Sequence, residues 1–294
     1  MSEICKLNEI YDKPNKSCVK QNSKRGKVIV KARNIDKIHK IRIPKSKERV
    51  KKTNFEGTPL HTLIGMLYLS HKFDDVSVLI PINLKKIMSN NFSHEDISLR
   101  WNEKQHKIKV PSHFWKYLNA YLTDSKRFIV FPFGFTCTDS GHANYIIYDK
   151  KDKCMERFEP YGTAVTSCIN KDIDKHIQTL FTEKMGNNFV NTYFQPLKID
   201  NYTGFQTKQS RERKFKKEND PDGFCTAWSI WYTDLRLSNP DKNRNELIYM
   251  TIIKLLADET SFTDFIRDYA DMIVKMKTDF IEKNYDSGIF SKYV

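Results

Sequence analysis

One cysteine of this sequence stands at a glycine turn where it could act as a nucleophile. Cys225 lies in the run 222–228, DGFCTAW, which leads into a stretch with apolar residues at helical spacing that closes at Asn239 and Pro240. A thiol in the first turn of a helix feels about half a positive charge from the helix N-terminus, which lowers its pKa and favours the reactive thiolate. The alternative is a small buried cysteine packed beneath the helix.

The histidine that would serve this cysteine must come from upstream. A cysteine nucleophile needs an imidazole to accept its proton and a third group to orient that imidazole. None of the eight histidines follows Cys225; they are His39, His61, His71, His94, His106, His113, His142 and His176. This order excludes mechanisms that take the histidine from downstream, as papain-like and ovarian-tumour-type deubiquitinating enzymes do.

His142 and Glu159 fit the ends of an antiparallel hairpin. His142 precedes an expected strand at 144–148, a charged turn follows at 149–153, and Glu159 lies near the end of a returning strand at 154–160. Antiparallel pairing places the start of one strand beside the end of its partner. We therefore expect Glu159 to orient His142, the alternatives being an ordinary strand-end histidine and a solvated hairpin carboxylate.

The chain order of these residues resembles one superfamily. A histidine, an acid 17 positions later and a cysteine at a helix start are similar to the adenoviral-protease and SUMO-deconjugating cysteine proteases, which include virion-maturation proteases of large DNA viruses. The resemblance covers about 130–185 and 189–240. The blocks that resemble a giant-virus branch of this superfamily are 142–144 (HAN), 157–162 (RFEPYG), 204–206 (GFQ) and 222–237.

The resemblance implies a thiol protease with Cys225 as nucleophile, His142 as general base and Glu159 as orienting acid. Three positions depart from the family pattern: Ala143 replaces a common Trp, Thr226 replaces a common Gly, and Glu159 replaces the usual Asp. Such an enzyme would hydrolyse peptide or isopeptide bonds of a protein substrate, in viral protein maturation or ubiquitin-like deconjugation. It would need no metal and no organic cofactor.

Two residues are candidates for the side chain that stabilises the oxyanion. Family members place a Gln shortly before the cysteine, where its amide holds the negative charge of the tetrahedral intermediate. Asn219 lies six residues before Cys225, whereas Gln206 lies nineteen residues before it, at the end of a strand-like segment. The intervening segment 207–220 is expected to be an exposed basic loop. We favour Gln206, because a strand end holds a side chain more rigidly, and keep Asn219 as the alternative; either could also be an ordinary turn amide.

Three other interpretations compete with a protease. Cys137, His142 and Cys154 could bind zinc, although C-x4-H without a second pair is a weak signal. A catalytically inactive scaffold with a protease fold is another reading, since a fold does not guarantee activity. A basic nucleic-acid-binding protein would explain the charge but not the order of histidine, acid and cysteine. One hyper-reactive thiol at Cys225 would indicate a protease, whereas a binding module predicts six unremarkable thiols.

The net charge of +14 is concentrated near the start of the 294-residue sequence. Residues 1–55 hold 17 Lys and Arg against five acids, and Tyr11 is the one aromatic residue there before Phe55. This predicts a basic, flexible N-terminal extension that could bind nucleic acid or another polyanion through phosphate contacts. The six cysteines show no framework spacing, so we expect reduced thiols.

No signal peptide or membrane span is recognised in the sequence. We therefore expect an intracellular protein of the host cytoplasm, alternatively packaged in a virion, that does not bind membranes.

The remaining residues, 56–294, are expected to form one catalytic domain. Its fold class is α+β, with a central mixed β-sheet flanked by helices, as in cysteine proteases, and with the nucleophile at a helix N-terminus facing the sheet edge. The expected helices are 59–73, 111–122, 172–184, 245–257 and 261–283; the further expected strands are 127–135 and 189–193, with a short hairpin of 27–32 and 40–44.

Overall fold

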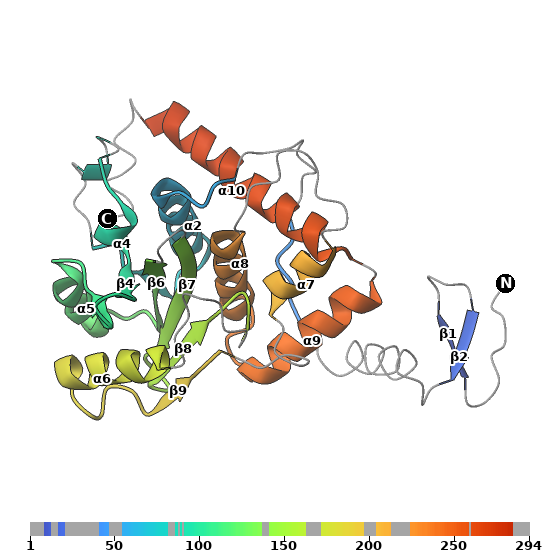
Figure 1. Ribbon diagram of the computed structural model, residues 1–294, viewed down its shortest axis with the longest axis horizontal. Helices are drawn as coiled ribbons and strands as arrows, with labels where there is room; N and C mark the ends of the chain where they lie inside the picture. Colours follow the sequence, from blue (N-terminus) through green and yellow to red (C-terminus); the bar gives the residue numbers. More distant parts are fainter. Residues whose placement is uncertain are drawn as a thin grey trace.

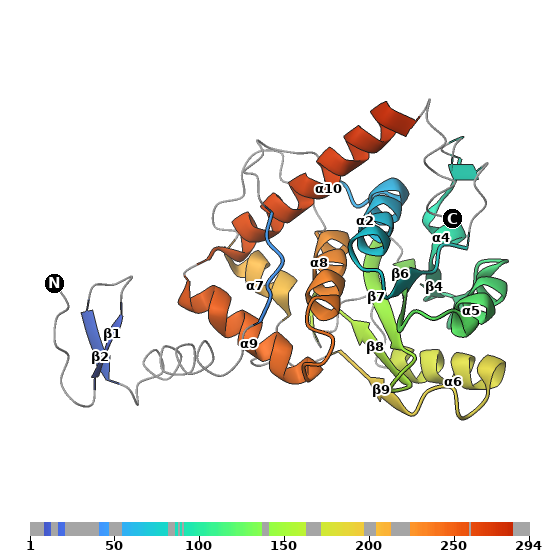
Figure 2. The same cartoon turned by 180° about the vertical axis from the view of Figure 1, so that it is seen from behind.

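The described part of the chain is an α+β structure built on a mixed sheet. The computed structural model describes residues 9–12, 17–20, 41–46, 55–81, 86–87, 89, 91–136, 141–162, 172–196, 204–212, 224–258 and 260–284. In these ranges, helices cover both faces of a seven-stranded sheet (Figures 1 and 2). A separate antiparallel ribbon joins β1 (Glu9–Asp12) to β2 (Ser17–Lys20).

The long strands at the centre of the sheet form consecutive hairpins. The order is β5-β4-β6-β7-β8-β9, with β3 paired to β6 beyond the end of β4. Pairing is antiparallel in β4–β5, β6–β7 and β7–β8, and parallel in β3–β6, β4–β6 and β8–β9. The strands are β3 (Val76–Val78), β4 (Leu99–Asn102), β5 (Lys107–Lys109), β6 (Phe128–Thr136), β7 (Gly141–Asp149), β8 (Cys154–Phe158) and β9 (Thr192–Phe194).

Alternation along the central strands creates two apolar cores. In β6, Val130 faces one core while Ile129 and Phe131 face the other, as expected for a strand buried on both sides. The first core contains residues of α2 (Pro59–Lys72), α7 (Phe205–Glu212), α8 (Cys225–Leu237), α9 (Arg244–Ala257) and α10 (Phe262–Asn284). The second contains residues of α5 (Phe114–Thr123) and α6 (Ile173–Met185), and the short α4 (His94–Ile97) lies beside α2.

Helix α8 is the central element of the first core. All thirteen of its residues are buried, and it packs along β7 (Figures 1 and 2). The Tyr232 ring stacks on Phe158 of β8 at 4.0 Å between centroids. Its buried polar groups are satisfied: Tyr232 and Arg236 both donate hydrogen bonds to Glu156 of β8. Since apolar packing and buried polar bonds act together, the helix is fixed firmly against the sheet.

Most of the elements expected from the sequence are confirmed within a few residues. The expected strand 189–193 is wrong in its start: Phe189 stacks on Tyr148 at 4.5 Å, and pairing begins only at Thr192. Residues 205–212 are helical, so the first part of the expected basic loop 207–220 is wrong. In the expected hairpin of 27–32 and 40–44, only 41–44 are described, and they form no strand.

Among the residues that the structure describes, no helix is both long enough and apolar enough to cross a bilayer.

Gly65 permits the close approach of α2 to α8. A Cβ built on Gly65 would lie 2.3 Å from Cδ1 and 2.7 Å from Cγ1 of Ile230, a fully buried side chain. We expect Gly65→Ala to lower the free energy of unfolding by about 1–3 kcal/mol, because the added methyl overpacks this contact. Urea denaturation measures the change.

Gly141→Ala is the matched control for that experiment. A Cβ at Gly141 meets no atom within 4 Å, so its unfolding free energy should change little. Combining Gly65→Ala with Ile230→Val should give less than the sum of the two single losses, because the smaller side chain makes room for the methyl. Additive losses in the double variant would argue against a direct clash.

Candidate active site

Cys225 is the first residue of α8. The N-cap is Phe224, whose carbonyl accepts a hydrogen bond from the Trp228 amide at 2.8 Å, and no acidic residue occupies the first turn. The thiol therefore sits at the positive end of the helix dipole without a carboxylate of its own helix nearby. Cys225 is only 7% exposed. The expectation of a cysteine at a helix N-terminus is confirmed.

His142 lies in the second position of β7, which begins three residues earlier than expected. Its Cα is paired with that of Phe135 on β6, and the imidazole lies beside the rings of Phe135 and Tyr161, at 5.5 and 5.2 Å between centroids. Nε2 of His142 lies 2.7 Å from Oε1 of Glu159. The ring is also hydrogen-bonded to the Cys225 thiol, for which Nδ1 is the nitrogen that remains. The structure thus brings together the three residues proposed from the sequence.

Two contacts join the start of α8 to β7 beside His142. The Cys225 sulfur is hydrogen-bonded to the backbone of Ala143. One helical turn later, the Ser229 hydroxyl donates to the Ala143 carbonyl at 3.2 Å. Residues four apart on a helix share one face, so Cys225 and Ser229 hold Ala143 between them. These contacts fix the position of the thiol along β7 relative to the imidazole of His142.

The charges at the site favour an ionised thiol. Burial has the largest influence on Cys225 and by itself would raise its pKa, but the hydrogen bond and charge of His142 outweigh it, so the pKa lies below the ordinary value. Burial likewise opposes protonation of His142, yet the Glu159 charge and the hydrogen bond with Cys225 raise the pKa of the imidazole to about 10. A lowered thiol pKa beside a raised imidazole pKa favours a thiolate–imidazolium pair at neutral pH.

The Glu159 carboxylate is buried and receives hydrogen bonds on both oxygens. Oε1 accepts from the Tyr161 amide at 2.9 Å as well as from His142, and Oε2 accepts from the Asn144 side chain at 2.9 Å. Arg157 lies 3.6 Å from Oε2. Burial works against ionisation, but His142, Arg157 and the Tyr161 amide together hold the pKa of Glu159 below its usual value. The carboxylate therefore stays charged and keeps one orientation.

A second layer of buried polar groups fixes Arg157. Its guanidinium donates to both carboxylate oxygens of Asp174, at 2.8 and 2.9 Å, and also to the side-chain Oδ1 of Asn144. The Tyr193 hydroxyl donates to Asp174 at 2.7 Å. Sequence reasoning missed this layer. A signal was available, because Asn144 and Arg157 are polar residues within apolar strands and have the same strand parity as His142 and Glu159.

Gln206 lies in the first turn of α7, not at the end of a strand, so that part of the expectation is wrong. Its backbone N–H donates to the Pro160 carbonyl at 2.9 Å, and the Gly204 backbone N–H donates to the Tyr161 carbonyl. A Cβ on Gly204 would lie 2.2 Å from the Pro160 oxygen, so glycine is required for this close approach. Gln206 is 1% exposed, and its side-chain Oε1 has no hydrogen-bond partner among the residues that the structure describes. Asn219 is outside the described residues.

The zinc interpretation finds no support in the described part of the chain. No cluster of three or more His, Cys, Asp or Glu suited to a metal ion occurs among the residues that the structure describes. His142 uses its ring nitrogens on Glu159 and Cys225, and Cys154 is buried in β8. Cys137 lies outside the described residues.

The comparisons with known sequences give one distant relative. No protein-family model matches the chain. A putative ankyrin repeat protein of Acanthamoeba polyphaga mimivirus is 26% identical over 251 residues, which are 79% of this chain and 33% of that protein. The chain therefore spans about a third of the curated relative it matches.

Three solved structures that are similar to the chain are remote from it in sequence. The ChlaDub1 structure from Chlamydia trachomatis aligns with a TM-score of 0.40 and 11% identity, covering 79% of this chain and 95% of that chain. The C. trachomatis effector Cdu1 bound to ubiquitin gives 0.38 and 10%, covering 76% and 92%. The C-terminal Ulp1 protease domain in complex with Smt3, the yeast ortholog of SUMO, gives 0.33 and 12%, covering 84% and 95%.

Removing Arg157 should destabilise the fold strongly. We expect Arg157→Met to lower the free energy of unfolding by about 3–5 kcal/mol, because the buried Asp174 and Glu159 would lose their shared cation. Chemical denaturation at pH 7 measures the loss. In the control, Lys86→Met, the partner Asp96 is only partly buried and stays solvated, so the loss should be about 0–1 kcal/mol. Equal losses in the two variants would contradict the prediction.

The thiol of Cys225 should react with iodoacetamide near neutral pH. Peptide mass spectrometry across pH 5 to 9 should show fast labelling of Cys225 and slow labelling of Cys154, because burial first and the neighbouring carboxylates second raise the pKa of Cys154 to about 11. His142→Ala should move half-maximal labelling of Cys225 to higher pH, since the imidazolium that stabilises the thiolate is gone.

His113→Ala is the matched control for the labelling experiment. His113 is exposed at the N-cap of α5, so its loss should leave the labelling profile of Cys225 unchanged. A wild-type profile in which Cys225 labels no faster than Cys154 at pH 7 would refute the activated thiol.

Proposed function

We propose that the protein is a thiol peptidase that hydrolyses peptide or isopeptide bonds. The observation that carries the proposal is the continuous hydrogen-bonded series from Cys225 through His142 to Glu159. In this assignment Cys225 is the nucleophile, His142 the general base and acid, and Glu159 the orienting acid. The burial of all three and the separate support of Glu159 suit a preorganised site.

The catalytic cycle follows from the positions of these groups. The Cys225 thiolate attacks the substrate carbonyl carbon, and the C=O electron pair moves onto oxygen. The Cys225 backbone amide at the helix start and the Gln206 side chain are assigned as donors to this oxyanion. The His142 imidazolium then protonates the leaving amine and the C–N bond breaks, which leaves a thioester. Neutral His142 takes a proton from water, and the hydroxide attacks the thioester carbon and displaces the Cys225 thiolate. This restores the thiolate–imidazolium pair, and the acid product leaves.

Two classes of protein substrate remain open for this site. A viral structural protein would be cut at a peptide bond during maturation, and a conjugate of a ubiquitin-like protein would be cut at an isopeptide bond. Both reactions use the same three residues. The second candidate function is a catalytically inactive scaffold, favoured only by the low exposure of Cys225, which a substrate must reach. Binding of nucleic acid by residues 1–55 stays a prediction.

Turnover of fluorogenic substrates tests the proposal. The probes are ubiquitin and SUMO carrying a C-terminal aminocoumarin, and peptides that end in Gly-Gly-aminocoumarin. Cys225→Ala should abolish release of the fluorophore, and His142→Ala should reduce kcat about 10²–10⁴-fold through loss of general acid–base catalysis. Gln206→Ala should reduce kcat about 10²–10³-fold if its amide holds the oxyanion.

His113→Ala again serves as control and should keep wild-type turnover. Release of the fluorophore that survives Cys225→Ala would overturn the assignment of the nucleophile. Fast labelling of Cys225 without turnover of any probe would mean that the thiol is activated but that the substrate is of another kind than these probes. Slow labelling together with no turnover would favour the inactive scaffold.

A further inference from the structure

The edge strand β5 carries its charged side chains on one face of the sheet and its apolar side chain on the other. Among the described strands it has a neighbour, β4, on one side only. In the β4–β5 register, Lys109 lies opposite Arg100, and Ile108 lies opposite the buried Trp101. Because side chains alternate along a strand, Lys107, Lys109 and Arg100 share one face of the sheet, while Ile108 belongs to the face of the second core. The edge is therefore basic on one face and apolar on the other.

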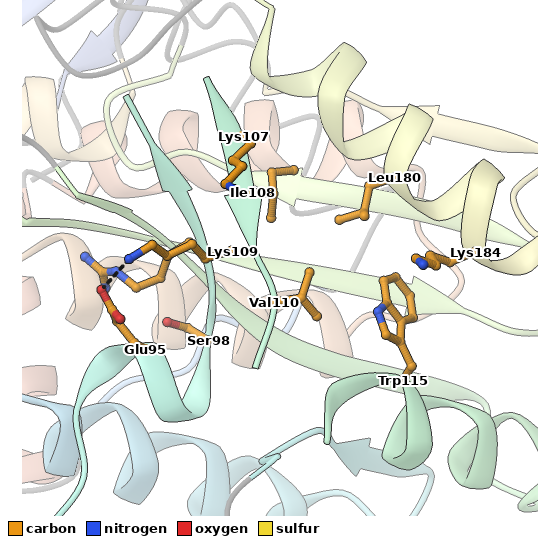
Figure 3. A pocket seen from close by; sticks show the side chains of 10 residues that line it. Glu95, Ser98, Lys107, Ile108, Lys109, Val110, Trp115, Leu180 and Lys184 are labelled. Atoms are coloured by element: carbon orange, nitrogen blue, oxygen red, sulfur yellow. Dashed lines mark hydrogen bonds and ion pairs between the residues drawn. The ribbon is translucent and has the colours of Figure 1, made fainter. Parts of the chain in front are cut away.

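A hollow of about 490 Å³ opens at this edge. Figure 3 shows Glu95, Ser98 and Lys109 on one side of it and a group of apolar side chains on the other, with Lys184 next to Trp115. The lining residues are Glu95, Ser98, Arg100, Lys107, Ile108, Lys109, Val110, Trp115, Leu180 and Lys184. Four of these are cations and one is an anion, so the hollow attracts negative charge.

Placing Arg100 opposite Lys109 works against folding, because like charges directly across a strand pair repel. The compensation within the hollow is small: Glu95 lies 3.5 Å from Lys109, and both side chains are largely exposed. Arg100 donates to neutral oxygens, the Thr136 hydroxyl at 3.0 Å and the Phe135 carbonyl at 2.7 Å. An anion in the hollow would relieve this repulsion.

The other wall of the hollow offers apolar surface that the fold leaves partly open. Ile108, Val110, Trp115 and Leu180 are each only partly buried, although all four lie against the second core or α6. The Trp115 ring is held at a fixed angle by edge contacts with Phe114 and Phe181, at 5.0 and 5.4 Å. A partly exposed tryptophan packed against other rings and beside aliphatic side chains is a surface that binds an apolar side chain well.

Lysines on an edge strand also have a simpler explanation, since they discourage pairing with other strands. That explanation accounts for the exposed Lys107 and Lys109. It does not account for Arg100, which is partly buried on the inner strand β4, nor for the aromatic wall on the opposite face. The combination of a cationic face, an apolar face and an open backbone edge matches an extended ligand of the opposite pattern.

We propose that this hollow binds an extended segment of a partner protein in which acidic and apolar residues alternate. The segment adds to the open edge of β5 through main-chain hydrogen bonds. Its carboxylates then lie against Arg100, Lys107 and Lys109, and its apolar side chains lie against Trp115. The lining of this hollow includes none of the three residues proposed for catalysis, so binding of the partner is measured without turnover.

Fluorescence anisotropy of the full chain tests the site with three fluorescein-labelled probes. They are the peptide (Glu-Val)4, the block peptide Glu4Val4 of the same composition, and a twelve-nucleotide single-stranded DNA. We expect (Glu-Val)4 to bind more tightly than the block peptide, because only the alternating pattern fits both faces at once. Lys107→Glu combined with Lys109→Glu should weaken (Glu-Val)4 binding about tenfold or more, and Trp115→Ala should weaken it too.

The matched control is Lys116→Glu combined with Lys175→Glu, two exposed lysines outside the hollow with the same change in net charge. Its affinity for (Glu-Val)4 should stay within about twofold of wild type. Equal weakening in the control, or unchanged binding after reversal of Lys107 and Lys109, would overturn the proposal. Tighter binding of the DNA than of (Glu-Val)4, lost on the same reversal, would overturn it in favour of a nucleic-acid site.

Discussion

The architecture around the candidate site depends on keeping one carboxylate charged inside the protein. Burying an ionised carboxylate costs several kcal/mol unless hydrogen bonds and an opposite charge replace the lost water. Glu159 obtains these from His142, Asn144, the Tyr161 amide and the nearby Arg157. His142 and Asn144 come from the neighbouring strand β7, so the hairpin must keep its register to keep the charge. The need for a compensating charge also applies to Arg157, because this buried cation in turn requires Asp174 at the start of α6.

Cys225 reaches this arrangement from the other core. His142, Asn144 and Glu159 share the strand parity of the second core, whereas α8 packs in the first. Cys225 meets His142 because His142 is the second residue of β7 and α8 begins beside the start of that strand. Cys225 and Ser229 both contact Ala143, the next residue of β7. A small side chain at Ala143 leaves room for the start of α8 to approach the strand.

The strand pattern and the glycine turn predicted the central hairpins and the position of Cys225, because alternation and helix-start signals are local. The pairing of His142 with Glu159 was also predictable, since a short turn fixes the register of a hairpin. The helix at 205–212 was not, because its sequence is polar and basic and its stability comes from Phe205 packing on Trp228 and Trp231. The Arg157–Asp174 pair joins residues seventeen apart through a tertiary contact, which no local pattern specifies.

The close contact of Gly204 with the turn at 160–162 sets the position of Gln206 independently of its distance along the sequence from Cys225. Hydrogen bonds from Gly204 and Gln206 fasten the start of α7 to the turn at 160–162, directly after Glu159. The position of Gln206 in space is therefore determined by the turn that follows Glu159 and not by the length of chain that leads to Cys225. The start of α7 is held by this turn and the start of α8 by Ala143 of β7, so neither contact depends on the number of residues between the two helices. Insertions at this point of the sequence would therefore lengthen the chain while the distances inside the site stay constant.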